Sequence, residues 1–104
     1  MKKISFAFLL AVLAQSGFAA DHLVDQKDKA FSKKNLKIKQ GDTVEFRNSD
    51  PFFHNVFSLS DIKAFDLGSY PQGSSKKVTF DKPGKVEVEC SIHPQMQMLI
   101  EVEK

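Results

Sequence analysis

The sequence predicts an all-β fold, a Greek-key β-sandwich or barrel of about seven to eight strands. Three observations support this class. Short stretches in which apolar and polar residues alternate recur between turn signals, which is typical of strands that bury one face. No long helical period, repeat or low-complexity linker interrupts them. The 104 residues are enough for one small domain.

The first clear pair of strands lies in the stretch LKIKQGDTVEFRN. Leu36 and Ile38 alternate with lysines before a turn at residues 40–42. After the turn, Val44 and Phe46 alternate with charged residues. Because successive side chains on a strand point to opposite faces, the apolar residues of each segment share an inward face. We expect the chain to turn back on itself here.

The stretch SSKKVTFDKPGKVEVEC repeats this pattern. Val78 and Phe80 alternate before a Pro-Gly turn, and Val86, Val88 and Cys90 share one face after it. The final stretch, MLIEVEK, alternates in the same way and is expected to be the last strand.

The segments between these pairs are less regular. Residues 21–31 are weakly patterned and are expected to supply an edge strand. Residues 52–60 follow a turn at 49–51 and are expected to form a strand, whereas residues 61–74 read as an irregular connection. Since tryptophan is absent, we expect four phenylalanines to fill the core: Phe31, Phe46, Phe57 and Phe80.

The N-terminal segment has the three parts of a secretory signal. Lys2 and Lys3 precede an apolar run over residues 4–14, which a small and polar segment follows. The run is too short to span a bilayer comfortably, so we expect cleavage and no stable membrane anchoring. We place the signal peptide at residues 1–19, uncertain by one residue, and a single domain at residues 20–104. Export by this route predicts a periplasmic protein.

Charge and cysteine content narrow the function classes. The 15 basic and 13 acidic residues give a net charge of +2, and two of the basic residues lie in the signal segment, so the domain itself is formally neutral. No bulk attraction to nucleic acid or anionic lipid is therefore expected. One cysteine excludes an internal disulfide. A small domain often needs some other cross-link to be stable. A metal is the next candidate.

Metal-ligating side chains gather in the nine-residue stretch CSIHPQMQM. Cys90 lies at the end of an inward-facing strand, and His93 and Met96 follow at intervals of three residues. Pro94 prevents the strand from simply continuing. A lone buried cysteine is more often a structural residue. A loop that curls back, however, can present several of these side chains to one point.

A further ligand must come from another segment, and His54 is the candidate. Its parity with Val56 puts it on the inner face, at the start of a strand. A histidine in that position is usually a satisfied core residue, but two imidazoles, a thiolate and a weak thioether form the ligand set of a trigonal blue-copper centre. Such a set fits neither Cu(II) nor Cu(I) fully, so little changes on electron transfer. We expect one type 1 copper ion with four ligands: His54, Cys90, His93 and Met96.

The same segments resemble the cupredoxins, the type 1 copper family of plastocyanin, pseudoazurin and amicyanin. IKQGDTVEFRNSD resembles the family's Gly-Asp, alternating strand and Asn-x-Asp pattern, and HNV matches its first histidine ligand. VTFDKPGKVEVECSIHPQM resembles its Phe, Pro-Gly, strand and Cys-x-x-His run. The resemblance covers essentially the whole domain and implies a cupredoxin-like one-electron carrier, not an enzyme.

Two methionines compete for the axial position. The plastocyanin and pseudoazurin pattern, Cys-x₂-His-x₄-Met, would select Met98. The amicyanin pattern, Cys-x₂-His-Pro-x-Met, matches CSIHPQM and selects Met96. Met98 also shares its parity with Ile100, so it reads as the first core residue of the last strand. We predict Met96.

The resemblance has two further implications. Asn55 and Ser91 occupy positions that the family joins by a hydrogen bond, which would tie the two ligand-bearing segments together. Redox partner proteins, whose donor and acceptor the sequence does not identify, are expected to dock near His93 and Pro94. Residues 51–53 could extend this apolar patch or could instead be core. We expect a monomer.

Other functions use the same residues. Copper storage or delivery in the periplasm is the main alternative, although the domain has few methionines for it. A thiol enzyme would pair Cys90 with His93 but needs a cleft and oxyanion donors, and a zinc site would share the ligands. Cleavage after Ala19 would also make His22 the third residue of a Cu(II)- or Ni(II)-chelating terminus. A histidine in a frayed end is the plainer interpretation.

Overall fold

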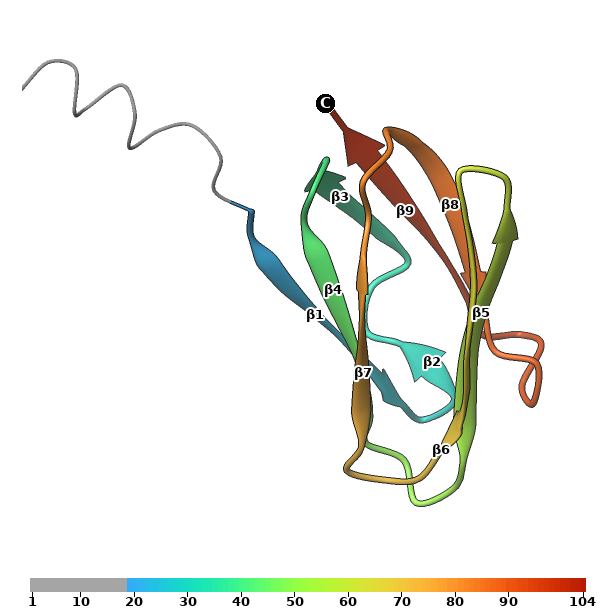
Figure 1. The fold of residues 1–104 in the computed structure, drawn as a ribbon. Helices are drawn as coiled ribbons and strands as arrows, with labels where there is room; N and C mark the ends of the chain where they lie inside the picture. Colours follow the sequence, from blue (N-terminus) through green and yellow to red (C-terminus); the bar gives the residue numbers. More distant parts are fainter. Residues whose placement is uncertain (1–18) are drawn as a thin grey trace, which may run out of the picture.

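The computed structural model describes residues 19–104, which form a two-layered β-sandwich (Figure 1). The predicted signal peptide lies outside the described residues except for its last position. Within residues 19–104 no helix is long and apolar enough to cross a membrane.

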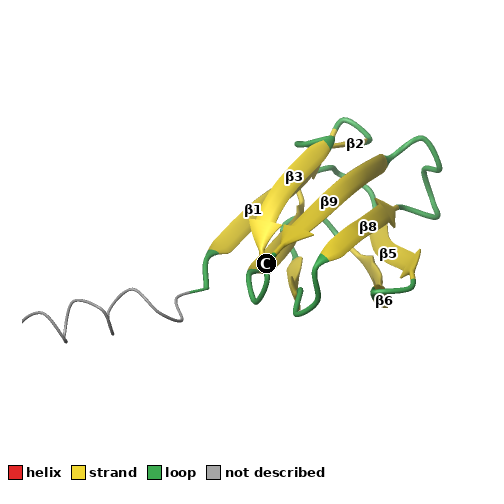
Figure 2. Cartoon of the chain, turned by 90° about the horizontal axis from the view of Figure 1, so that it is seen from above, coloured by secondary structure: helices red, strands yellow, loops and turns green. Residues whose placement is uncertain are grey.

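Nine strands lie in two sheets, which confirms the predicted fold class. One sheet has the order β2-β1-β4-β7, and the other has the order β3-β9-β8-β5-β6. Figure 2 shows β3, β9, β8 and β5 of the second sheet side by side. The bounds are β1 (Asp21–Lys27), β2 (Ala30–Phe31), β3 (Asn35–Lys39), β4 (Thr43–Asn48), β5 (His54–Ser60), β6 (Lys63–Tyr70), β7 (Ser75–Thr79), β8 (Gly84–Glu89) and β9 (Gln97–Glu103).

The two expected fold-backs are crossovers between the sheets. β3 pairs in parallel with β9, whereas β4 pairs with β1 and β7 in the opposite sheet. The turn between them uses Gly41 at φ 96°, a conformation that glycine adopts without steric cost. β7 and β8 also belong to different sheets. In these strands, alternation correctly indicated which side chains face inward. It holds no information on which strands become neighbours in a sheet.

Two weakly patterned segments contain more strands than predicted. Residues 21–31 form β1 and β2: β1 lies inside its sheet, between β2 and β4, and the two-residue β2 is the edge strand that this segment was expected to supply. The segment read as an irregular connection contains β6, an edge strand that pairs with β5 through a bulge. The side chains of β6 before Tyr70 are half-buried or exposed, because one side of an edge strand has no neighbour. Phe65 and Leu67 nevertheless alternate with exposed residues and pack against the core, so the prediction of an irregular connection missed a signal that the sequence contains.

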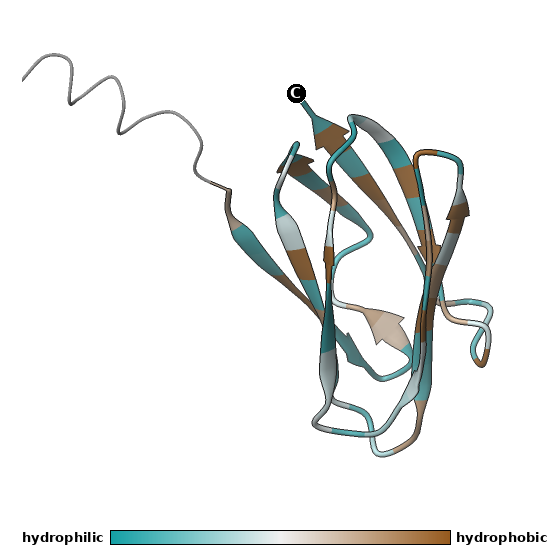
Figure 3. Cartoon of the chain, viewed as in Figure 1, coloured by the Kyte–Doolittle hydropathy of each residue, from teal (hydrophilic) through white to brown (hydrophobic). Residues whose placement is uncertain are grey.

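The core lies between the sheets, where the apolar side chains of each strand alternate with polar ones (Figure 3). Phe31, Phe46 and Phe80 are buried there as predicted. Phe57 is only half-buried, because His54, Val56 and Ser58 occupy the inner face of β5. The prediction for Phe57 is therefore wrong. Phe57 directly follows the inward-facing Val56 on the strand, so its side chain points to the opposite face.

Candidate metal centre

Three of the four predicted ligands meet at one end of the sandwich. The Nδ1 atoms of His54 and His93 lie 3.2 Å apart. The Cys90 Sγ lies 3.7 Å from Nδ1 of His54 and 3.9 Å from Nδ1 of His93. Within residues 19–104, this is the cluster of metal-ligating side chains that the structure brings together.

The triangle has the dimensions that a trigonal metal ion needs. Bonds of about 2.0–2.1 Å to nitrogen and about 2.3 Å to sulfur would span these separations, so the three atoms could bind one ion together. Trigonal His₂Cys coordination is the arrangement of blue-copper sites. The donor set and its size therefore both fit copper.

Burial and charge keep the imidazole of His93 in a ligating state. His54 and Cys90 are fully buried, and His93 is half-buried. Burial lowers the pKa of His93, and the neighbouring His54 and the charge of Lys29 lower it further. A neutral imidazole is the form that binds a metal ion. His93 is therefore held in the form that can bind a metal ion.

The loop that carries Cys90 and His93 is closed by its own backbone. The N–H of Cys90 donates to the carbonyl of Met96 at 3.3 Å, and the N–H of Met96 donates to the carbonyl of His93 at 2.8 Å. The Oδ1 of Asn55 accepts the backbone N–H of Ser91 at 2.7 Å. This confirms the predicted tie between the two ligand-bearing segments, through the backbone of Ser91.

Both methionines of the loop region are buried. Met96 is 1% exposed and shares the backbone contacts of the ligand loop. Met98 lies opposite Val88 in the β8–β9 pairing, as expected for a core residue of the last strand. The choice of Met96 as axial ligand stays a prediction.

Asp50 is a site residue whose role the sequence did not predict. Its Oδ2 lies 2.6 Å from Nε2 of His54, which must carry the proton of this bond because a carboxylate only accepts. The backbone N–H groups of Asp28 and Lys29 donate to the same carboxylate at 2.6 and 3.0 Å. Burial opposes ionisation, but these bonds hold the pKa of Asp50 below its usual value. Asp50 therefore fixes the tautomer of His54 that leaves Nδ1 free for a metal.

Asn48 shapes the loop that presents Asp50. Its Oδ1 accepts the N–H of Asp50 at 2.8 Å. Its Nδ2 donates to the carbonyls of Phe52 and Tyr70 at 2.8 and 2.9 Å. The Asn-x-Asp pattern noted in the sequence was the available signal for both residues.

Phe52 covers the two histidines. Its ring centroid lies 5.3 Å from that of His54, edge-on, and 5.3 Å from that of His93. Phe52 is half-buried, whereas its neighbour Phe53 is 54% exposed and Ile92 is 45% exposed. Phe52 therefore belongs to the site, and Phe53 belongs to the surface.

His22 lies at the other end of the sandwich. It belongs to β1, whose pairing with β4 begins at Asp21, so the expectation of a frayed end is wrong. Its Nε2 lies 2.9 Å from Oδ2 of Asp42. A chelate through the backbone nitrogens would have to form at the start of this strand, so the structure gives the chelating terminus no support.

Fold and site define a class of protein: a two-sheet β-sandwich that gathers two histidines and a cysteine at one end. The chain belongs to the family described as copper binding proteins, plastocyanin/azurin family, which it matches over residues 19–103. The resemblance to cupredoxins is thereby confirmed. Copper is the metal of this family, and His54, Cys90 and His93 form a potential copper site.

Two curated relatives support the assignment. The methylamine utilization protein MauL of Methylorubrum extorquens is 29% identical over 100 residues, covering 95% of this chain and 88% of MauL. The chloroplastic plastocyanin of Fritillaria agrestis is 32% identical over 97 residues, covering 80% of this chain and 58% of the plastocyanin.

Solved structures agree. Amicyanin in a reduced Cu(I) form superposes with a TM-score of 0.74 at 26% identity, over 86% of this chain and 88% of amicyanin. The Cu-containing nitrite reductase of Thermus scotoductus SA-01 gives a TM-score of 0.76 at 30% identity over 81% of this chain. The chain spans 22% of that reductase.

Proposed function

We propose that the protein is a periplasmic one-electron carrier with one type 1 copper ion. The observation that carries this proposal is the triangle of His54 Nδ1, Cys90 Sγ and His93 Nδ1, with sides of 3.2 to 3.9 Å. When bound there, copper supplies a Cu(II)/Cu(I) couple. The protein's part is to hold the three ligand atoms in nearly the same place in both oxidation states.

The rigidity of the site comes from hydrogen bonds that do not involve the metal. Asp50 holds the His54 ring from behind, and Asn55 ties the strand of His54 to the loop of Cys90. Buried groups with satisfied hydrogen bonds move little, so a change of charge at the ion causes little rearrangement around it. A small rearrangement is what fast electron exchange requires.

We assign Met96 as the fourth, weak axial ligand. The support is its burial within the ligand loop and the Cys-x₂-His-Pro-x-Met spacing. Replacing the thioether by an amide in Met96→Gln is expected to shift the reduction potential and the visible spectrum of the copper protein. Met98→Gln is the matched control, and a shift there with none in Met96→Gln would transfer the assignment to Met98.

Redox partners are proposed to dock at the end where His93 reaches the surface. His93 is half-buried, and Pro94, Ile92, Pro51 and Phe53 around the site are exposed. Weak redox encounters bury little area, which suits a small apolar patch. This patch would bring a partner close to the ion without a stable complex, and the protein itself would remain a monomer.

The proposed compartment and the proposed cleavage site both rest on the sequence of the N-terminal segment. Lys2, Lys3, the apolar run and the small residues after it support export and cleavage after Ala19. The periplasm is the compartment that such a signal implies. Mass spectrometry of the protein isolated from its host is expected to find Ala20 as the first residue.

The experiment that tests the function begins with the metal-free protein. Addition of one equivalent of Cu(II) is expected to produce an intense visible thiolate-to-copper band, whereas Zn²⁺, a d¹⁰ ion, should give no visible band in the same site. Reversible voltammetry of the loaded protein then distinguishes a carrier from a storage or delivery protein. No visible band, or a band with no reversible couple, would contradict the proposal.

A further inference from the structure

Among the connections at this end of the sandwich, the exposed charges lie in one segment. Three of the connections at this end, residues 49–53, 71–74 and 91–96, contain no charged side chain at the surface apart from His93, because Asp50 is buried. The segment between β1 and β3 is different. It carries three lysines and one aspartate, all exposed: Asp28, Lys29, Lys33 and Lys34.

Lys29 is held in a fixed position next to the exposed ligand. Asp28 and Lys29 have φ angles of 56° and 58°, as in the two-residue turns that glycine or asparagine usually occupy. The buried carboxylate of Asp50 accepts both of their N–H groups, which compensates for the strained backbone. The Lys29 Nζ then lies 5.7 Å from the ring centroid of Phe52, whose ring packs against His93. A positive charge is therefore presented one aromatic ring away from His93.

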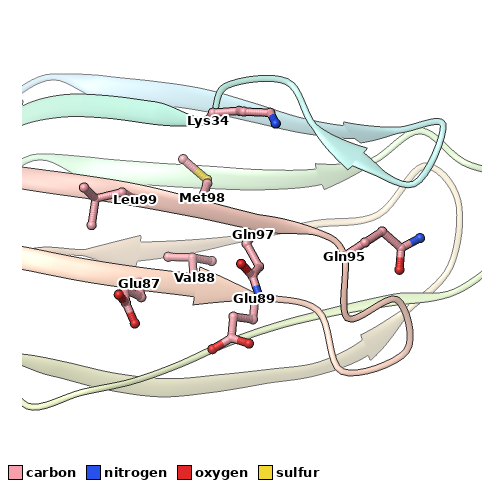
Figure 4. A pocket seen from close by; sticks show the side chains of 8 residues that line it. All are labelled: Lys34, Glu87, Val88, Glu89, Gln95, Gln97, Met98 and Leu99. Carbon is pink, nitrogen blue, oxygen red and sulfur yellow. The ribbon is translucent and has the colours of Figure 1, made fainter.

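Lys34 extends the positive side along the ligand loop. Lys29 and Lys34 border the same small hollow, of about 100 Å³, with Gln95 and Met96 of the loop. On the other side of Lys34 a larger hollow of about 430 Å³ reaches β8, where Glu87 and Glu89 lie (Figure 4). The positive charge is thus confined to the β2 side of the loop, and β8 presents the opposite sign.

We infer that the electron-transfer partner of this protein is a protein with carboxylates beside its own redox centre, and that it docks over Lys29 and Lys34 with His93 at the centre of the contact. The domain as a whole is formally neutral, so this local charge decides the orientation in which a partner approaches. The inference rests on the proposed carrier function. It adds the sign of the partner's surface and the side from which it binds.

The test measures electron transfer from the Cu(I) protein to the trianion hexacyanoferrate(III). One electron passes from Cu(I) to Fe(III), giving Cu(II) and Fe(II), and no bond or proton is involved. The wild-type rate is expected to fall as salt is raised from about 10 mM, where charges act over roughly 30 Å, to about 0.5 M. Lys29→Glu is expected to be about five- to tenfold slower at low salt and to lose this salt dependence.

Lys82→Glu is the matched control. Lys82 lies in the exposed turn between β7 and β8, at the other end of the sandwich, and the substitution changes the net charge by the same amount. Its rate is expected to stay within about twofold of wild type. A cationic oxidant, tris(phenanthroline)cobalt(III), should reverse the order, so that Lys29→Glu becomes the faster variant.

The possible outcomes distinguish a failure of this inference from a failure of the proposed carrier function. Equal rates for Lys29→Glu and Lys82→Glu, in a protein that exchanges electrons normally, would overturn the inference alone. A copper protein that exchanges electrons with neither oxidant would overturn the carrier function as well. Because the turn uses the backbone of Lys29 and not its side chain, both variants should keep the wild-type visible spectrum, and this is checked first.

Discussion

The two ends of the sandwich contain the same arrangement of a buried aspartate and a histidine. At the end with the potential copper site, here called the copper end, the carboxylate of Asp50 accepts two backbone N–H groups and contacts Nε2 of His54 at 2.6 Å. At the opposite end, the carboxylate of Asp42 accepts the backbone N–H groups of Ala20 and Lys39 and contacts Nε2 of His22 at 2.9 Å. Both aspartates are buried.

What differs is the surroundings of the second imidazole nitrogen. Nδ1 of His54 faces the sulfur of Cys90 and the ring of His93. His22 is 26% exposed and is not part of the metal-ligating cluster found within residues 19–104. The comparison teaches that a carboxylate–histidine pair alone does not identify a functional site. At one end it orients a histidine of the potential copper site, and at the other it fastens the start of β1 to the β3–β4 turn.

The largest expected effect comes from removing the sulfur at the copper end. Cys90→Ser retains the size of the buried side chain but removes the soft ligand, so the intense visible band should be lost completely on addition of Cu(II). Absorption spectroscopy measures this, and thermal unfolding of the metal-free variant controls for the fold. His22→Gln, the matched change at the other end, should retain the full band.

Removing the carboxylate behind His54 should have the next largest effect. Asp50→Asn weakens the bond that orients the ring, and loss of such a partner typically costs 10–100-fold in metal affinity. Competition with a copper chelator measures the loss. Asp42→Asn is the control and should bind copper as the wild type does. Equal losses in the two variants would mean that the ends do not differ in the way described.

Asp42 should matter for stability instead. In Asp42→Asn the amide NH₂ replaces an acceptor that Ala20, Lys39 and His22 share, so one or more donors lose their partner. The expected loss is about 1–3 kcal/mol of unfolding free energy. Urea denaturation of the metal-free protein measures it, and an unchanged midpoint would show that the fastening contributes nothing.

The smallest effect is the acid dependence of that fastening. A hydrogen bond from Ala20, with further bonds from His22 and Lys39, lowers the pKa of Asp42 to about 2. Because the unfolded value is higher, near 3.9, this contribution is complete above about pH 5 and is lost as the pH falls through about 2. The difference in unfolding free energy between wild type and Asp42→Asn should therefore shrink across this range, and a constant difference would contradict it.

The sequence predicted which side chains face the core better than it predicted which strands pair. Alternation placed Val86, Val88 and Cys90 on the inner face, and all three are buried. It could not predict that β3 pairs with β9, because register and neighbour depend on contacts between distant segments. The strand β6 was missed altogether, although Phe65 and Leu67 alternate with exposed neighbours.

The site was predictable where its members share a short spacing or a clear parity. The spacing of Cys90 and His93 and the inward position of His54 were sufficient to bring three ligands together. The Asn-x-Asp pattern marked Asp50 but not its role, which depends on the N–H groups of Asp28 and Lys29, more than twenty residues away. No local pattern reports a contact of that separation.

The most direct test of the central claim is a copper K-edge X-ray absorption spectrum of the protein loaded with one equivalent of copper. The account predicts one sulfur and two nitrogens as the nearest atoms, from Cys90, His54 and His93. Copper held at the His22 end would show nitrogen and oxygen neighbours only. A spectrum without a copper–sulfur distance would contradict the account.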